Sequence, residues 1–145
     1  MHGISCVVSR MSEPRRLTAA DIMTKRVVTG GPNSEISEIA VKMQRNKIGS
    51  VVIIESGKVI GIVTERDFVR VTESVAAMLD KNRARHYMTK PVVTVQPDML
   101  VADVIDLMKD KNIRHVVVLD KSGELAGVIS SRDLTKATMG AVSTQ

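Results

Sequence analysis

Gly61-Ile-Val-Thr-Glu-Arg-Asp67 returns 66 positions later as Gly127-Val-Ile-Ser-Ser-Arg-Asp133. Each stretch starts with a glycine and two apolar residues, continues with a hydroxyl side chain and ends in Arg-Asp. This pattern is typical of a buried strand that runs directly into the first turn of a helix. Its recurrence predicts a fold built from two copies of one unit.

The repetition extends over most of the chain. Residues 22–55 align with residues 87–120 at an offset of 65, and residues 57–70 align with residues 123–136 at an offset of 66. One residue is therefore inserted between the two aligned blocks, at a turn where hairpins tolerate a change of length. A repeat of about 50 residues buries too little surface to be stable alone, so we expect the two copies to pack face to face around one core.

Each copy is predicted to contain three strands and two helices. Apolar residues at helical spacing (Ile36, Ile39, Ala40 and Met43 in the first copy) follow the first strand, and β-branched runs form the next two strands. The expected strands are residues 27–29, 51–54 and 59–63 in the first copy and residues 92–95, 116–119 and 125–129 in the second. The fold class is α/β, of the α+β type, with two β-α-β-β-α repeats packed with pseudo-two-fold symmetry.

The repeat boundaries divide the chain into five parts. We expect a flexible N-terminal tail (1–18), the first copy (19–70), a helical connector (71–83), the second copy (84–137) and a C-terminal tail (138–145). At the boundary between the first two parts, Thr18-Ala-Ala-Asp21 is predicted to start a short helix that enters the first copy.

Composition excludes several classes of function. Aromatic residues make up 1% of the chain, which disfavours stacking platforms for single-stranded nucleic acid. The single cysteine, Cys6, rules out an intrachain disulfide, and the three histidines show no metal-ligand spacing. No apolar run approaches the roughly 20 residues of a membrane span. We therefore expect a cytoplasmic protein without a membrane or metal partner.

The repeated hydroxyl and carboxylate carry two interpretations. Thr64-x-x-Asp67 and Ser130-x-x-Asp133 match a helix capping box, in which the two side chains satisfy free N–H groups of the first turn. The same groups at a helix N-terminus also suit a ribose diol and a phosphate. The two roles are compatible, and the spacing by itself favours the cap.

The sequence resembles the cystathionine-β-synthase-like (CBS) domain pair, also called a Bateman module. Besides the two Gly-to-Asp stretches, the resemblance rests on Asp21-Ile-Met-Thr24, His86-Tyr-Met-Thr89 and Lys111-Asn-Ile-Arg-His-Val-Val-Val-Leu-Asp120. It covers about residues 19–136. No one motif is specific, but two ordered sets in tandem are strong support.

The resemblance implies two pseudo-symmetric sites for AMP, ADP, ATP, S-adenosylmethionine, methylthioadenosine or a related adenosyl ligand, and no required cofactor. Asp67 and Asp133 match the ribose-binding aspartates of the family, and Thr64 and Ser130 match its hydroxyl contacts. In the family, the strand that meets the adenine of one site comes from the opposite repeat. The resemblance therefore implies that Asp133 shares a site with Val28 and Thr29, which follow the first Met-Thr motif. The site with the second-repeat aspartate is expected to contain Val28, Thr29, Arg114, His115, Val128, Ser130, Arg132 and Asp133. The second site is expected to contain Ile62, Thr64, Arg66, Asp67, Val93 and Thr94.

The two expected sites are not equal. The second copy carries Arg114-His115 where the first copy carries Gly49-Ser50, at the place where relatives direct basic residues toward phosphates. Charge-assisted hydrogen bonds there are worth about 1.5–3 kcal/mol each when well aligned. The sequence therefore favours the Asp133 site.

These features predict a regulatory module rather than an enzyme. Ligand binding would act on a partner protein of unknown identity, and the resemblance implies a homodimer in which two pairs form a four-repeat disc. One alternative is a structural or interaction module with vestigial sites. Another is a basic protein that associates with nucleic acid; the net charge of +5 permits this, but the scattered basic residues and the absence of a recognition motif make it unlikely.

Overall fold

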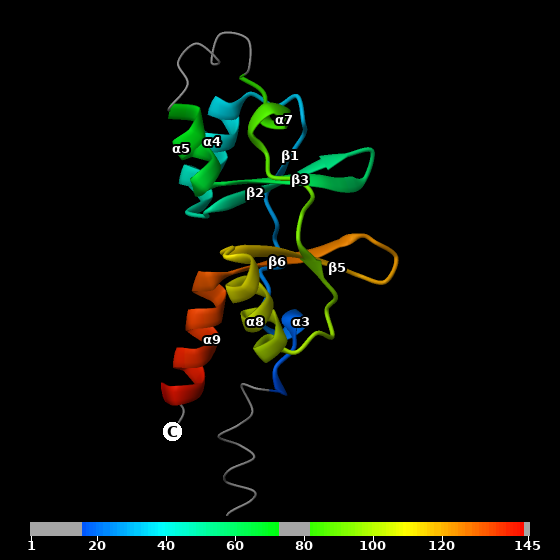
Figure 1. Cartoon of the computed structure of the whole chain (residues 1–145), viewed down its shortest axis with the longest axis vertical. Helices are drawn as coiled ribbons and strands as arrows, with labels where there is room; N and C mark the ends of the chain where they lie inside the picture. Colours follow the sequence, from blue (N-terminus) through cyan, green and yellow to red (C-terminus); the bar gives the residue numbers. More distant parts are fainter. Residues whose placement is uncertain (1–15, 73–81, 144–145) are drawn as a thin grey trace, which may run out of the picture. The chain divides into compact units, whose positions relative to one another are not determined.

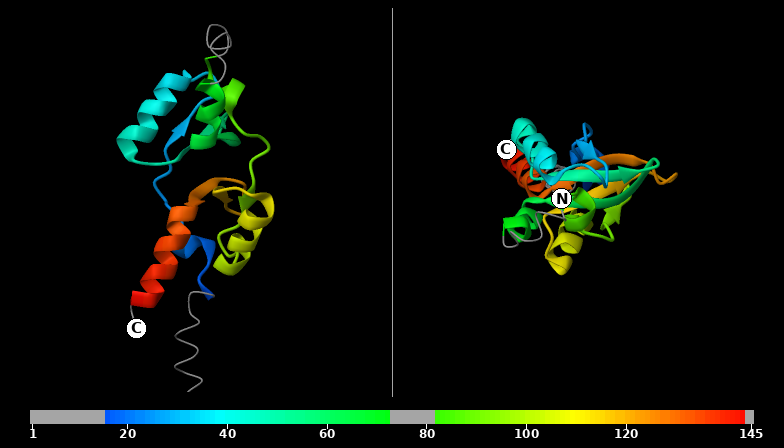
Figure 2. Two further views of the ribbon diagram at one scale, coloured as in Figure 1. Left: turned by 60° about the vertical axis from the view of Figure 1, so that its left-hand side comes forward. Right: turned by 90° about the horizontal axis from the view of Figure 1, so that it is seen from above.

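The computed structural model describes residues 16–72 and 82–143 (Figure 1). These residues form two compact units. We call them the Asp67 unit (residues 26–72, 82–93 and 123–125) and the Asp133 unit (residues 16–25, 94–122 and 126–143). Each unit has a three-stranded sheet with its helices on one face (Figures 1 and 2). The mixed α and β architecture confirms the predicted fold class.

In the Asp67 unit the strand order is β1-β2-β3, with β1 parallel and β3 antiparallel to the central strand. Its elements are β1 (Thr29–Gly30), α4 (Ile36–Asn46), β2 (Ser50–Glu55), β3 (Lys58–Thr64), α5 (Glu65–Thr72) and α7 (Ala84–Tyr87). The β-branched runs form β2 and β3 as predicted. They are joined at Ser56 and Gly57, whose positive φ angles fit a tight hairpin turn.

The Asp133 unit repeats this arrangement with the order β4-β5-β6, and β4 runs parallel to β5. Its elements are α3 (Ala19–Ile22), β4 (Thr94–Val95), α8 (Val101–Lys111), β5 (His115–Leu119), β6 (Leu125–Ser130) and α9 (Ser131–Ser143). Leu125 alone of these residues is grouped with the Asp67 unit. The helix α9 continues past residue 137, where the second copy was expected to end.

The first strand of each copy is shorter than predicted. Only Thr29 and Gly30 in β1, and Thr94 and Val95 in β4, pair with the neighbouring strand. The chain leaves the sheet just before a proline in both copies, and proline has no N–H group to continue a ladder. The proline limits only the end of each strand; the valines that were expected to begin these strands lie before the first paired residue.

The apolar stripes of α4 and α8 are buried, as their spacing predicted. Ile36, Ile39 and Met43 of α4 belong to the core of the Asp67 unit. The matching residues of α8, Val101, Val104 and Met108, are at most 5% exposed. Both central strands are buried as well, with Val51–Ile53 and Val116–Val118 fully inaccessible. Aliphatic side chains thus fill the cores of a chain nearly devoid of aromatic residues.

The short helices α3 and α7 each lie in the unit that is formed mainly by the other repeat: α3 in the Asp133 unit and α7 in the Asp67 unit. The segment after α3 pairs with β6, where the N–H of Thr24 donates to the carbonyl of Val128 at 2.8 Å. The segment after α7 pairs in the same way with β3, where Thr89 donates to Ile62 at 2.8 Å. Each segment covers an edge strand that would otherwise expose unpaired backbone groups. The compact units therefore differ from the sequence repeats 19–70 and 84–137.

Two glycines leave room for these segments to approach β3 and β6 closely. A Cβ at Gly127 would lie 2.6 Å from the sulfur of Met23 and 2.9 Å from the carbonyl oxygen of Thr24. A Cβ at Gly61 would lie 2.5 Å from the sulfur of Met88. The glycine that opens each repeated motif is thus required by the close approach of a second segment.

The tails and the connector are described in part. Residues 1–15, 73–81 and 144–145, which include most of the expected N-terminal tail and connector, lie outside the described residues. Leu17 and Thr18, assigned to the tail, are ordered: Val101 donates its N–H to the carbonyl of Leu17 at 2.7 Å, and Thr18 forms a bridge with Leu100. No helix among the described residues is long and apolar enough to cross a bilayer.

Candidate functional site

Asp67 and Asp133 stand in the first turn of α5 and α9, and both close the predicted helix cap. The N–H of Thr64 donates to Asp67 Oδ2 at 2.8 Å, and the N–H of Ser130 donates to Asp133 Oδ2 at the same distance. Asp133 returns a bond from its own N–H to Ser130 Oγ at 3.2 Å. The capping role inferred from the spacing is confirmed in both copies.

A second hydroxyl reaches each carboxylate from the segment that pairs with the edge strand. Thr89 Oγ1 donates to Asp67, 3.0 Å from Oδ1 and 3.3 Å from Oδ2, and Thr24 Oγ1 donates to Asp133 Oδ1 at 3.4 Å. We did not predict these contacts. The recurring Met-Thr-Lys sequence was the available signal, but its partner became visible only when the segments were placed on their sheets.

The carboxylate of Asp67 is enclosed. Asp67 is 3% exposed. Arg70 covers the carboxylate, and its Nη2 donates to Asp67 Oδ1 at 2.7 Å. The same nitrogen donates to the carbonyl of Tyr87 at 2.6 Å, so the guanidinium ties α5 to α7. Asp67 therefore has hydrogen bonds on both oxygens from its cap, from Thr89 and from Arg70.

The carboxylate of Asp133 borders open space instead. Asp133 is half-buried and lines an open surface depression of about 270 Å³ between α3 and α9, which we call the cavity, together with Asp21, Ile22, Lys136 and Ala137. Lys136 occupies the position of Arg70 in the repeat. The cavity therefore offers two carboxylates and an ammonium group to a polar ligand.

Asp21 adds a carboxylate to this cavity that stays ionised to a lower pH than an ordinary aspartate. Its carboxylate accepts the backbone N–H of Thr18 at 2.8 Å and the Thr18 hydroxyl at 3.0 Å. The backbone bond first, and the hydroxyl bond second, lower the pKa of Asp21 below its ordinary value of 3.8.

The backbone of the basic pair predicted for the phosphate side adjoins the start of α9. The carbonyl of Arg114 accepts the N–H of Ser131 at 2.9 Å, which places Arg114 at the start of α9 next to Ser130. His115 follows as the first residue of β5 and is half-buried. In the first copy Gly49 makes the equivalent backbone contact with Glu65 at 3.1 Å, without a basic side chain.

The other predicted residues fall into three groups. Val128 and Ile62 are buried at 8% and 6% exposure, and their backbones pair with Thr24 and Thr89. Arg66 and Arg132 are exposed in the first turns of α5 and α9. Val28, Thr29 and Val93 belong to the Asp67 unit and Thr94 to the Asp133 unit. The expected sharing of a site by Asp133 with Val28 and Thr29 joins different units and stays a prediction.

Comparison with known proteins establishes the family. The profile of the CBS domain matches residues 19–74 and 84–140, so the chain belongs to the CBS-domain family. An uncharacterized protein of Methanopyrus kandleri is 40% identical over 121 residues, which are 83% of this chain and 62% of that protein. The chain thus spans less than two thirds of this relative.

Solved structures share the fold. The CBS-domain containing protein ATU1752 from Agrobacterium tumefaciens is similar with a TM-score of 0.76 and 35% identity over 84% of this chain and 93% of that one. The CBS domain pair of protein MJ0100, solved in complex with 5-methylthioadenosine and S-adenosyl-L-methionine, gives a TM-score of 0.75 and 28% identity over 85% of this chain and 96% of that one. A domain pair of this fold, that of MJ0100, therefore binds adenosyl ligands.

Proposed function

We propose that this chain is a regulatory module that binds an adenosyl ligand, with Asp133 as the carboxylate that receives the ribose hydroxyls. The observation that carries the proposal is the difference in access between the two capping aspartates. Asp133 borders a cavity, and the hydrogen bond from Thr24 to its Oδ1 is long at 3.4 Å. A carboxylate oxygen with free acceptor capacity suits the O–H groups of a ribose diol.

The start of α9 suits the phosphate side of such a ligand. Its thirteen residues form a helix whose N-terminus favours negative charge, and Ser130 and Arg114 lie at that end. The side chains of Arg114 and His115 add basic groups that the first copy lacks. A phosphorylated adenosyl compound such as AMP, ADP or ATP is the ligand class that uses all of these groups.

The known complexes support the adenosyl part of this proposal. The ligands of the MJ0100 pair share adenine, ribose and a methyl-substituted 5′ sulfur, and S-adenosylmethionine carries an amino-acid chain in addition. A carboxylate for the ribose is useful to all such ligands, whereas Arg114 and His115 favour those with phosphates. Binding would regulate a partner protein by favouring one arrangement of the chain, and two copies would associate as a homodimer.

A thermal-shift screen tests the proposal. AMP, ADP, ATP, S-adenosylmethionine, methylthioadenosine and NAD are added to the full chain, and a ligand at 100 times its dissociation constant stabilises the folded state by about 2.7 kcal/mol. We expect at least one adenosyl compound to raise the midpoint. If none does so, the binding role is wrong.

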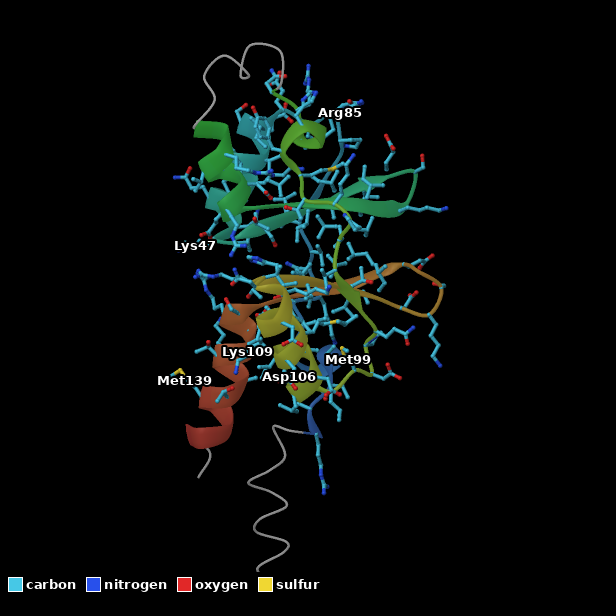
Figure 3. The ribbon with its side chains drawn as sticks, in the orientation of Figure 1. Lys47, Arg85, Met99, Asp106, Lys109 and Met139 are labelled. Carbon is cyan, nitrogen blue, oxygen red and sulfur yellow. The ribbon has the colours of Figure 1, made fainter. Side chains whose placement is uncertain are left out.

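The site assignment needs a matched control. Asp133→Ala and Arg114→Ala should remove or reduce the shift. Asp106→Ala should keep it, because Asp106 is an exposed residue of α8 in the same unit (Figure 3). A full shift in both site variants would move the site away from Asp133.

The capping geometry gives a specific basis for one alternative, a structural module with vestigial sites. In that case Asp133→Ala costs about 1 kcal/mol through the lost cap and no adenosyl compound changes the midpoint. The same screen therefore separates the two functions.

A further inference from the structure

The last helices of the two copies differ at several positions, one of which lies one turn after the capping aspartate. Arg70 of α5 aligns with Lys136 of α9, and the residues that surround them are otherwise matched: Thr64 with Ser130, and Thr89 with Thr24. Both helices start from the same cap. One difference beside the cap is the cation in the next turn, a guanidinium in α5 and an ammonium group in α9.

Arg70 uses this position to complete the hydrogen bonding of Asp67. A carboxylate offers about four lone-pair sites. Oδ1 accepts hydrogen bonds from Arg70 at 2.7 Å and from the Thr89 hydroxyl at 3.0 Å. Oδ2 accepts the N–H of Thr64 at 2.8 Å and the Thr64 hydroxyl at 3.2 Å. A ribose hydroxyl that approached Asp67 would have to displace one of these donors.

The geometry of Arg70 favours this closed arrangement. Its side chain is 57% exposed whereas that of Asp67 is 4% exposed, so the guanidinium lies over the carboxylate at the surface of the unit. Its second bond, to the carbonyl of Tyr87, fixes it from the opposite side. Both bonds come from one nitrogen, Nη2. A lysine at this position would carry the same charge on a flexible stem, without the planar guanidinium whose geometry matches a carboxylate.

Lys136 leaves the matching position in the second copy open. The residues that line the cavity there include Lys136, Asp133 and Ile22, and Ile22 is the counterpart of Tyr87. The place that the Arg70 bridge occupies in the Asp67 unit is therefore cavity in the Asp133 unit.

We infer that Arg70 is an internal occupant of the Asp67 site, so that the chain takes one adenosyl ligand and Arg70 determines this number. The inference rests on the proposed function and deepens it. Arg70 acts on the carboxylate that a ligand would use, and the two compete for the same lone pairs. Displacing a charge-assisted bond of this kind weakens a competing ligand by about 10- to 100-fold.

Isothermal titration of the full chain with AMP, and in parallel with S-adenosylmethionine, measures the number of sites. We expect about one ligand per chain for the unmodified protein. Arg70→Ala and Arg70→Lys should raise this to about two, the lysine variant giving both copies the same cation. Arg45→Ala, an exposed arginine of α4 in the same unit, should leave the number at one.

The reciprocal exchange tests the same idea from the other side. Lys136→Arg should weaken binding at the Asp133 site by about tenfold or more, because it places a guanidinium where the cavity is open. Melting curves test whether each variant is folded. Arg70→Lys keeps the positive charge and serves as the second variant if Arg70→Ala destabilises α5.

The outcomes separate this inference from the proposed function. One ligand in the unmodified chain and in both Arg70 variants overturns the role of Arg70 and leaves the adenosyl site standing. No ligand in the unmodified chain but one in the Arg70 variants supports the role of Arg70 and overturns the Asp133 site. Two ligands in the unmodified chain, or none in any variant, overturns the inference.

Discussion

Asp67 and Asp133 hold matching positions, and each accepts a bond of 2.8 Å from the backbone three residues earlier. Around Asp67, Arg70 and Thr89 complete the coordination of a buried carboxylate. Around Asp133 the equivalent threonine is more distant and a cavity takes the place of the arginine. The comparison teaches that a repeated motif can preserve a helix cap while the surroundings of the capping carboxylate differ between the copies.

Replacing the two carboxylates gives the largest contrast. Asp67→Ala should lower the free energy of unfolding by about 3 kcal/mol, since it removes a buried acceptor of charge-assisted bonds. Asp133→Ala should cost about 1 kcal/mol, which is the loss of a cap. Urea denaturation of both variants checks this, and equal losses would contradict the difference in their surroundings.

The two motif glycines extend the comparison to the segments that pair with the edge strands. Gly127→Ala should cost about 2 kcal/mol, because the added carbon meets the backbone oxygen of Thr24, which can move only with its strand. Gly61→Ala should cost about 1 kcal/mol, because its nearest contacts are with the flexible side chain of Met88. Thermal unfolding ranks the two variants. A larger loss at Gly61 would show that the Met88 side chain cannot rearrange.

The paired threonines predict a smaller difference. Thr89→Val removes a hydroxyl that lies 3.0 Å from the buried Asp67 carboxylate and should cost about 1 kcal/mol. Thr24→Val removes a bond of 3.4 Å and should cost under about 0.5 kcal/mol. The two denaturation midpoints should differ in this order, and the reverse order would mean that Thr24 holds Asp133 more firmly than its distance indicates.

Acid titration gives the smallest effect and concerns the cavity of the Asp133 unit alone. The folded pKa of Asp21 is lowered below 3.8, so the stability it contributes is present above the ordinary pKa and is lost as the pH falls through the folded value. Carboxyl chemical shifts recorded from about pH 5 to about pH 2 should show this low midpoint, and Thr18→Ala should raise it. A midpoint unchanged by Thr18→Ala would show that the cap does not lower the pKa.

Much of the fold was predictable because local patterns and tertiary structure agree. Helical spacing placed Ile36, Ile39 and Met43 in the core, and β-branched runs became the central strands. The lengths of β1 and β4 were not predictable, because strand ends depend on which neighbour is available for pairing. Within the site, the two caps followed from Ser/Thr-x-x-Asp, whereas Thr24 and Thr89 did not, since their partners are remote in sequence.

The sequence by itself determined the repeat, the order of strands and helices, the capping aspartates and the family. These depend on interactions between residues a few positions apart, whose geometry is the same wherever the pattern occurs. Only the tertiary structure decided that α3 and α7 join the unit formed mainly by the other repeat, because two similar edge strands can accept either segment as far as the sequence shows. It also decided that Arg70 closes Asp67 while Lys136 borders a cavity beside Asp133, because that depends on the distances between a side chain, a carboxylate and the neighbouring helix.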